Sequence, residues 1–151
     1  MERIKLSSFE LEEYDSCNSD HQEYTKYFED DEDYNAYMEP FWSFENSVNY
    51  DRKNGRYASI YFAYHNGVLV GMVGLIWIFD FPELVIGILK EHRGHHYSKL
   101  LYREYAEYVL KTYQEYKALY VSIQPENIHS VENALAAGFK QIDEYKYVKR
   151  G

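Results

Sequence analysis

The clearest pattern of hydrophobic and polar positions lies in residues 59–79 and predicts a β-hairpin. Ile60, Phe62 and Tyr64 recur at every second position, as in a strand that buries one face. The dipeptide Asn-Gly follows at 66–67 and is typical of a type I′ turn, because both of its central residues adopt positive φ. The stretch after this turn is long and apolar, so we expect it to form a central strand of a sheet.

Other stretches of the chain predict further strands and helices. Before the hairpin, we expect a strand over Arg3–Phe9, the start of a short helix at Glu10–Tyr14, and two aromatic-rich helices within residues 20–53. After a break at Asp80–Pro82, the pattern predicts, in order, a strand from Glu83, a helix over Tyr97–Tyr116, a strand over Leu119–Ile123, a helix from Pro125 to its C-cap Gly138, and strands over Phe139–Ile142 and Tyr145–Val148.

Spacing within these elements predicts which side chains face the core. We expect the core-facing positions to be Tyr97, Leu101, Tyr105 and Val109 in the first of the two later helices, and Ile128, Val131 and Leu135 in the second. Gly71 and Gly74 lie inside the long apolar strand, where a glycine marks a bulge or a close approach of two backbones.

Length and composition favour one domain, spanning residues 1–151, that is long enough to bury a core. Cys17 is the single cysteine, so the sequence predicts no internal disulfide and gives no sign of an oxidising compartment. The start of the chain lacks a basic segment followed by an apolar run, and no apolar run approaches the length of a membrane span. We therefore expect a cytoplasmic protein without a membrane partner.

The net charge of -9 is unevenly distributed along the chain. Residues 1–51 hold 15 acidic and three basic side chains, whereas residues 52–151 hold ten acidic and 13 basic ones. This contrast suits two ligands of opposite charge or one dipolar complex, and the alternative is an acidic helical surface that only keeps the protein in solution. Because no basic face stands out, we expect no nucleic-acid partner.

Residues 83–101 combine an apolar stretch, a basic turn and the start of an amphipathic helix. Backbone N–H groups in the first turn of a helix lack intrahelical partners, and the helix dipole adds partial positive charge there. Arg93 and Lys99 add full charges, so this stretch predicts a site for a phosphate or pyrophosphate. Neither the P-loop pattern nor the dinucleotide-binding G-x-G-x-x-G pattern occurs in the sequence.

Three histidines in the same stretch, His92, His95 and His96, raise the question of a metal site. Their spacing gathers the three rings only if all of them are helical, whereas we expect the turn before the helix at this point. No cysteine and no matched carboxylate cluster accompanies them. We therefore expect no metal and interpret the histidines as surface or phosphate-facing side chains.

The order of predicted elements and three local motifs resemble the GNAT superfamily of acyl-CoA-dependent N-acyltransferases. Residues 91–101 read E-H-R-G-H-H-Y-S-K-L-L and are similar to the family's acyl-CoA motif, Q/R-x-x-G-x-G/A followed by a helix. Asn127 and Ser130, with Gly-Phe at 138–139, match the family's second motif, and the hairpin H-N-G-V-L-V-G at 65–71 matches its x-G-x-x-V-G pattern. The resemblance covers nearly the whole chain and is closer from the hairpin onward.

This resemblance implies an α/β fold with a mixed, mostly antiparallel central sheet of about six to seven strands flanked by about four helices. It also implies transfer of an acyl group, most simply acetyl from acetyl-CoA, to an amine, with no metal involved. The backbone at 86–88 should pair with the pantetheine arm of the cofactor and offer an N–H to the thioester oxygen. The implied cofactor-binding residues are Ile86, Gly87, Ile88, Arg93, Gly94, His95, His96, Tyr97, Ser98, Lys99, Asn127 and Ser130.

Glu83 is the catalytic base that the resemblance implies, directly or through a water molecule, because relatives often place a glutamate at the start of this strand. The alternative interpretation of Glu83 is a surface side chain at a strand edge, and Asp80 is the second candidate for the base. Asn127 also has an alternative role, since asparagine favours the N-cap of a helix.

The sequence departs from the family pattern at four positions. His96 and Ser98 stand where the family usually has glycines, and a left-handed conformation costs a non-glycine residue roughly 1–2 kcal/mol. Ala134 replaces a tyrosine that is the general acid of many relatives, and Ser122 replaces a glutamate base of ribosomal-protein alanine N-acetyltransferases. These departures motivate two alternatives: a catalytically silent acyl-CoA-binding or interaction protein, and a structural domain that has lost the cofactor.

The resemblance implies that the acidic N-terminal half walls the acceptor site. This favours a cationic acceptor such as a polyamine, an aminoglycoside, a lysine side chain or a protein N-terminus. Tyr145 and Tyr147 are candidates for reaching that site from the closing strands, and core or surface positions are the simpler interpretation of both. The sequence identifies neither the acceptor nor the oligomeric state, and a homodimer is possible.

Overall fold

Eight strands form one sheet in the order β1-β2-β3-β4-β5-β6-β8-β7 in the computed structural model, which describes residues 3–151. The strands are β1 (Ile4–Lys5), β2 (Glu10–Glu13), β3 (Ser59–His65), β4 (Val68–Ile78), β5 (Phe81–Ile88), β6 (Ala118–Ser122), β7 (Lys140–Gln141) and β8 (Lys146–Arg150). Neighbouring strands are antiparallel, except that β5 and β6 run parallel. The predicted mixed, mostly antiparallel sheet is confirmed, and its additional strand is β2. Met1 and Glu2 of the predicted 1–151 domain lie outside the described residues.

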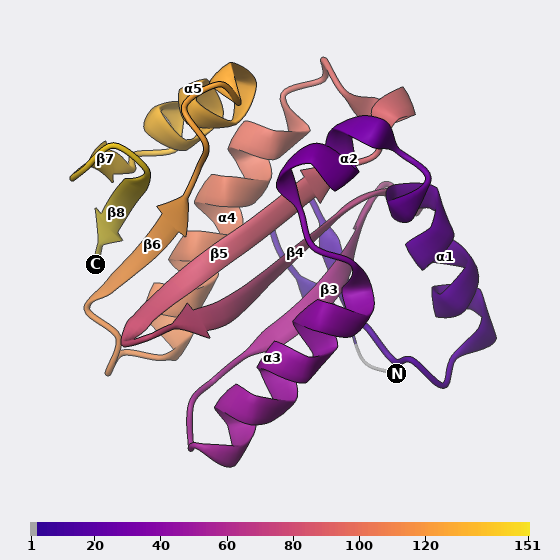
Figure 1. Ribbon diagram of the computed structural model, residues 1–151, viewed down its shortest axis with the longest axis horizontal. Coiled ribbons are helices and arrows are strands. Elements are labelled where there is room, and N and C mark those ends of the chain that lie inside the picture. The colour runs from indigo at the N-terminus through magenta and orange to yellow at the C-terminus, as the bar shows by residue number, and fades with distance from the viewer. Residues whose placement is uncertain (1–2) are drawn as a thin grey trace.

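The described chain has five α-helices, which cover both faces of the sheet (Figure 1). One face carries α1 (Ser19–Glu29), α2 (Glu32–Tyr37) and α3 (Phe41–Lys53), and the other carries α4 (Tyr97–Thr112) and α5 (Ile128–Ala136). A short 3-10 helix, η1 (Lys90–His92), lies between β5 and α4. Within residues 3–151, no helix combines the length and the apolar character that crossing a membrane requires.

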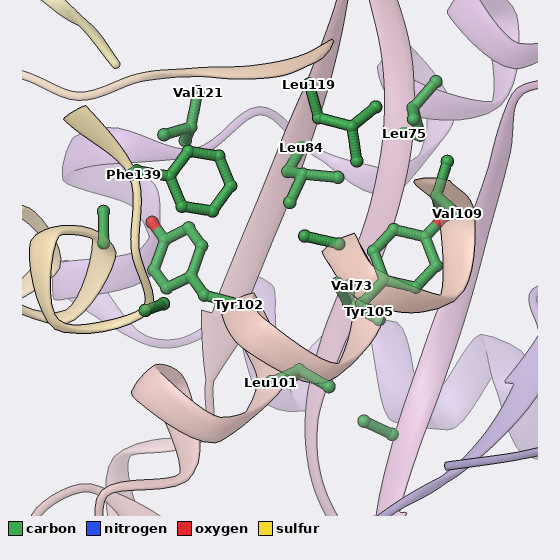
Figure 2. Close-up of a cluster of buried hydrophobic side chains, with 14 of the residues drawn as sticks. Val73, Leu75, Leu84, Leu101, Tyr102, Tyr105, Val109, Leu119, Val121 and Phe139 are labelled. Carbon is green, nitrogen blue, oxygen red and sulfur yellow. The ribbon is translucent and has the colours of Figure 1, made fainter. Parts of the chain in front are cut away.

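The hydrophobic core between α4 and the sheet consists mainly of aliphatic and tyrosine side chains. Leu101, Tyr105 and Val109, which were predicted to face inward, are fully buried. They pack in one cluster with Leu84 of β5 and Leu119 of β6 (Figure 2). This core fixes α4 beneath the two parallel strands.

The core on the opposite face is mainly aromatic. Phe28 of α1, Phe41 of α3 and Phe62 of β3 are fully buried. The ring centroid of Phe41 lies 5.4 Å from that of Phe28 and 5.4 Å from that of Phe62. The aromatic residues at helical spacing in the N-terminal half therefore attach the three helices to the sheet.

The hairpin between β3 and β4 confirms the predicted type I′ turn. Asn66 and Gly67 have φ angles of 51° and 80°, and both are therefore positive. The predicted close backbone approach in β4 is also confirmed. A Cβ atom added at Gly74 would lie 2.4 Å from the carbonyl oxygen of Ser59, so only glycine fits there.

Three predictions for the N-terminal part are wrong. The strand expected over Arg3–Phe9 is limited to β1, because the chain turns after Lys5, where the N–H of Leu6 donates to the carbonyl of Phe9. Glu10–Glu13 forms β2 and does not begin a helix, because it pairs with β1 on one side and with β3 on the other. Residues 20–53 form three helices instead of two, since the carboxylate of Asp31 accepts the N–H of Asp33 and starts α2 as a separate helix. The acidic run around Asp31 thus contains both a linker and a helix N-terminus.

Two predicted boundaries in the middle of the chain are also wrong. Pro82 does not break the chain but lies within β5, paired with Trp77, and the turn consists of residues 79–80. Helix α4 ends at Thr112, before the predicted Tyr116. The chain leaves the helix at Tyr113, whose ring stacks on that of Tyr57 with 4.0 Å between the centroids.

The inward face of α5 differs from the prediction. Val131 packs against the core, but Ile128 and Leu135 are 60% and 47% exposed. Ala134 and Ala137 occupy the buried positions instead. Their small side chains let the helix backbone approach its neighbours closely, which large side chains at these positions would prevent.

Candidate active site

The parallel strands β5 and β6 diverge toward their carboxyl ends (Figure 1), and a cleft lies at the point where they separate. Among the described residues they pair only at Glu83 and Tyr120. Beyond this pair, toward Ile88 and Ile123, the two strands diverge. A cleft of about 1160 Å³ opens there, lined by β5, the end of β6, α2, the loop before α4 and the start of α5. Glu83 marks its closed end.

The N-terminus of α4 lies at the cleft. Gly94 and His96 have φ angles of 89° and 62°, so the chain turns sharply just before the helix. No side chain in the described part of the chain caps α4 at His96. The N–H groups of Tyr97 and Ser98, in the first turn, are therefore available to an anion. The left-handed conformation considered for His96 is the observed one, and its side chain is exposed.

The cleft brings together most of the predicted cofactor-binding residues. Its lining includes Ile86, Gly87, Ile88, Arg93, Gly94, His96, Tyr97, Ser98, Asn127 and Ser130. His95 and Lys99 are the predicted residues that do not belong to the lining. Segments from β5, α4 and α5 thus meet at one place, so the first two motifs describe a single cleft.

The guanidinium of Arg93 contacts carboxylates from the N-terminal region. Its Nη1 lies 3.1 Å from Asp33, its Nη2 pairs with Asp31, and its Nε donates to the carbonyl of Ile88 at 3.2 Å. The side chain of Asp31 is only 8% exposed. Arg93 therefore ties the loop before α4 to the start of α2, and both of its terminal nitrogens are paired with carboxylates.

Glu83 is a buried carboxylate with two polar neighbours. It is 2% exposed, so the alternative interpretation as a surface side chain is wrong. The hydroxyl of Ser122 donates to its Oε1 at 2.5 Å, and Nζ of Lys146 lies 3.1 Å from its Oε2. Oε2 has no hydrogen-bond donor within residues 3–151, because the ammonium approaches it as an ion pair without the angles of a hydrogen bond.

Tyr102 of α4 and Ser130 of α5 meet in the cleft wall, with 2.8 Å between their hydroxyl oxygens. Burial raises the pKa of Tyr102 to about 12, against the opposing effect of the bond with Ser130. Asn127 stands at the N-cap position of α5, but its side chain makes no capping hydrogen bond in the described chain. Its amide therefore remains available to a ligand in the cleft.

Tyr102 and Lys146 were not predicted from the sequence as residues of the site. Tyr102 could not be distinguished by its sequence from the other tyrosines of α4. The available indication of its burial was its position next to the inward-facing Leu101. Lys146 lies in a closing strand, between Tyr145, which lines the cleft and is 48% exposed, and Tyr147, which is buried in the core. The sequence around Lys146 carries no signal of this role, because the pairing of β8 with β6 is needed to bring the lysine to Glu83.

Asp80, the second candidate for the base, lies away from the cleft. Its side chain is 94% exposed in the β4–β5 turn and pairs with Arg56 at 3.1 Å. Asp80 does not belong to the cleft lining. Glu83 is therefore the better placed of the two carboxylates.

The cleft lining is acidic. Besides Glu83, it contains Asp33 and Glu39 from the α2 side and Glu126 and Glu132 from the α5 side. The lining includes one arginine and no lysine among the described residues, and that arginine is already paired with carboxylates. Negative charge concentrated in this way attracts a cationic ligand.

The three histidines of the loop before α4 do not form a cluster with acidic or cysteine ligands. The ring of His95 lies 5.5 Å from that of Tyr97. Within residues 3–151, no group of three His, Cys, Asp or Glu side chains is placed to hold a metal ion.

Solved structures resemble this fold over its whole length. An acetyltransferase of the GNAT family from Bacillus anthracis superposes with a TM-score of 0.75 at 16% identity, covering 99% of this chain and 98% of that one. The ribosomal L7/L12 α-N-protein acetyltransferase RimL in complex with coenzyme A gives 0.75 at 10% identity, with the same coverage of 99% and 98%. The Campylobacter jejuni N-acetyltransferase PseH with acetyl coenzyme A gives 0.66 at 13% identity, covering 94% and 98%.

At these identities the solved structures show a shared fold. A search of curated protein sequences gave no match. The model of the acetyltransferase (GNAT) family matches residues 13–139, which is most of the chain. Together with the cleft between β5 and β6, this match means that the chain belongs to the GNAT family of acetyltransferases.

Proposed function

We propose that this acetyltransferase moves an acetyl group from acetyl-CoA to a primary amine of a cationic acceptor. The observation that carries the proposal is the cleft between β5 and β6. It has uncapped N–H groups of α4 at one side and a buried carboxylate, Glu83, at its closed end. The first feature suits a pyrophosphate, and the second suits proton removal from an amine.

Each part of the cleft has a role in this proposal. The N–H groups of Tyr97 and Ser98 hold the pyrophosphate, and the backbone at 86–88 pairs with the pantetheine arm and donates to the thioester oxygen. Asn127 contacts the cofactor through its side-chain amide, which makes no capping hydrogen bond to α5. Holding both reactants supplies up to ~7–11 kcal/mol of the barrier reduction, and Glu83 as base adds ~10²–10⁴-fold.

The acceptor is cationic in this proposal because the cleft lining is acidic. Glu39 and Glu126 stand on opposite walls, and Tyr37 and Tyr145 add aromatic rings over which an ammonium group can bind. The similar structure of RimL belongs to an enzyme of protein N-termini. A protein N-terminus, a lysine side chain, a polyamine and an aminoglycoside all fit this chemistry. We expect the protein in the cytoplasm, and a homodimer remains compatible with the proposal.

Two measurements test the proposal. Calorimetric titration with acetyl-CoA should give saturable heat, and the melting temperature should rise with the acetyl-CoA concentration. Release of free thiol should then follow the addition of spermidine, kanamycin or a hexapeptide with a free N-terminus. The absence of both heat and thermal stabilisation would contradict the binding of acetyl-CoA and therefore the proposal.

The second candidate is an acyl-CoA-binding protein without catalysis. Ala134 in place of a general acid and the pairing of Arg93 with Asp31 and Asp33 favour it. This candidate predicts heat on titration with acetyl-CoA but no thiol release with any amine. Unchanged acetyl-CoA affinity after Arg93→Ala and Asn127→Ala would instead contradict the proposed cofactor site.

A further inference from the structure

The group that an incoming amine meets at the closed end of the cleft is the hydroxyl of Ser122. Ser122 is exposed and belongs to the cleft lining. Glu83 behind it is 2% exposed, and its Oε2 atom is buried. Glu83 also belongs to the lining but has almost no accessible surface, so an acceptor amine reaches the serine hydroxyl more readily than the carboxylate.

The Ser122 hydroxyl points at the carboxylate of Glu83. Its Oγ donates to Oε1 at 2.5 Å. The register explains the contact, because β5 and β6 pair at Glu83 and Tyr120. Ser122 lies two residues beyond Tyr120, and residues two apart on a strand share one face of the sheet.

Lys146 holds the other oxygen of the same carboxylate. It lies directly opposite Ser122 in the β6–β8 ladder. Its Nζ lies 3.1 Å from Oε2 of Glu83 and 4.1 Å from the ring centroid of Phe81, so both contacts keep the ammonium in place. With Oε2 occupied by this charge, Oε1 is the oxygen that can accept a proton, and it faces Ser122.

We propose that Ser122 is a catalytic residue that relays the acceptor's proton to Glu83, with Lys146 as a positioning residue; this rests on the proposed acetyl transfer. As the amine nitrogen attacks the thioester carbon, one N–H proton moves to Ser122 Oγ and the serine proton moves to Glu83 Oε1. The amide bond forms, the C–S bond breaks, and coenzyme A leaves as a thiolate. The proton of Glu83 then returns to Ser122, and the serine proton passes to the sulfur.

Ser122→Ala tests the relay, with acetyl-CoA and the most active amine among spermidine, kanamycin and the hexapeptide. We expect kcat to fall about 10- to 100-fold, while the KM for acetyl-CoA and the melting temperature stay close to wild type. Ser122→Thr keeps a hydroxyl and should recover most of the loss. The single variant Glu83→Gln and the double variant Glu83→Gln/Ser122→Ala should have the same low kcat, since the two groups act as a unit. Ser47→Ala, on α3 and outside the lining, is the matched control.

Three outcomes decide against the proposal. Full kcat in Ser122→Ala with loss in Glu83→Gln shows that Glu83 takes the proton without the serine, and overturns the relay alone. No thiol release from the wild type with any amine overturns the proposed function and the relay together. If Ser122→Ala does not fold, single turnovers of the wild type in H2O/D2O mixtures decide. The rate plotted against deuterium fraction should curve, because two protons move, and a straight line contradicts the relay.

Discussion

Arg93 and Asp31, 62 positions apart in the sequence, form an ion pair between the loop before α4 and the N-cap of α2. Asp31 also caps α2 by accepting the N–H of Asp33, whose own carboxylate lies 3.1 Å from the guanidinium. Both terminal nitrogens of Arg93 are thus used inside the protein. This is the position at which the family resemblance implies a contact with the cofactor.

Removing the two carboxylate charges should tighten the binding of acetyl-CoA. In the double variant Asp31→Asn/Asp33→Asn the amide at position 31 can still cap α2, but Arg93 is released for the pyrophosphate. We expect a gain of about 1 kcal/mol, which is roughly a fivefold lower Kd by calorimetric titration.

Glu32→Gln is the matched control for this experiment. Glu32 lies in the same first turn of α2 and is exposed, and its carboxylate forms no ion pair within the described chain. Its removal should leave the Kd within about twofold of wild type. A weaker affinity in the double variant would mean that the ion pair builds the cofactor site and does not compete with it.

Glu12 links β2 to α1 through bonds that depend on its charge. Its Oε1 lies 2.7 Å from Nε2 of His21 and accepts the hydroxyl of Tyr64 at 3.1 Å. Nδ1 of His21 accepts the N–H of Asp15, so Nε2 carries the proton that is donated to Glu12. Burial opposes ionisation, but the bonds from His21 and Tyr64 and the charge of Arg3 outweigh it and lower the pKa of Glu12 below its ordinary value of 4.5.

Glu12→Gln should therefore destabilise the protein in a pH-dependent way. Because the pKa is lower in the folded state, the contribution of Glu12 is present above about pH 4.5 and is lost as the pH falls through the folded value. We expect the free energy of unfolding in urea to drop by about 1–2 kcal/mol at pH 7 and by less at pH 3. An equal drop at both pH values would contradict the role of the charge.

Asp51 has the opposite linkage. It is 2% exposed, and burial raises its pKa above the ordinary 3.8, although the N–H of Trp77 at 2.9 Å and the charge of Arg56 oppose this. The contribution of Asp51 to stability is therefore complete below about pH 3.8 and is lost as the pH rises through the folded value. Asp51→Asn keeps an acceptor for Trp77 and removes the buried charge.

The melting temperature of Asp51→Asn should accordingly exceed that of the wild type by about 2–4 °C at pH 7, for a gain of roughly 1 kcal/mol. At pH 3.5 the two proteins should melt at similar temperatures. A lower melting temperature of the variant at pH 7 would show that the attraction between Asp51 and Arg56 outweighs the cost of burial.

Local chemistry made much of the fold predictable. The turn at 66–67 needs two residues with positive φ, and Asn-Gly is the pair that adopts this conformation most readily. The start of α4 and the long strand β4 were predictable for the same reason, since both depend on neighbours in sequence. The strand β2 was missed because a four-residue stretch with one buried leucine carries little periodicity.

The residues that complete the site come together through long-range packing. Lys146 reaches Glu83 only because β8 pairs with β6, and Arg93 reaches Asp31 only because α2 lies over the loop before α4. In the sequence, Ser122 occupies a position where some relatives have a glutamate base. In the structure, the carboxylate of Glu83 on the adjacent strand accepts a hydrogen bond from this serine. No local pattern contains these pairings.

His96 carries backbone strain in the loop before α4, and His96→Gly should relieve it. His96 has φ 62° at the N-cap of α4, a conformation that glycine adopts without penalty. We expect the free energy of unfolding in urea to rise by about 0.5–1 kcal/mol, because the gain exceeds the entropy that glycine adds to the unfolded chain. His95→Gly is the matched control, since His95 is not among the residues with positive φ in the described chain, and it should lower the free energy of unfolding by roughly 0.5–1 kcal/mol. Acetyl-CoA affinity should rise in His96→Gly, because the amide then faces the pyrophosphate without a Cβ beside it. Equal effects of the two substitutions on stability would mean that His96 carries no strain.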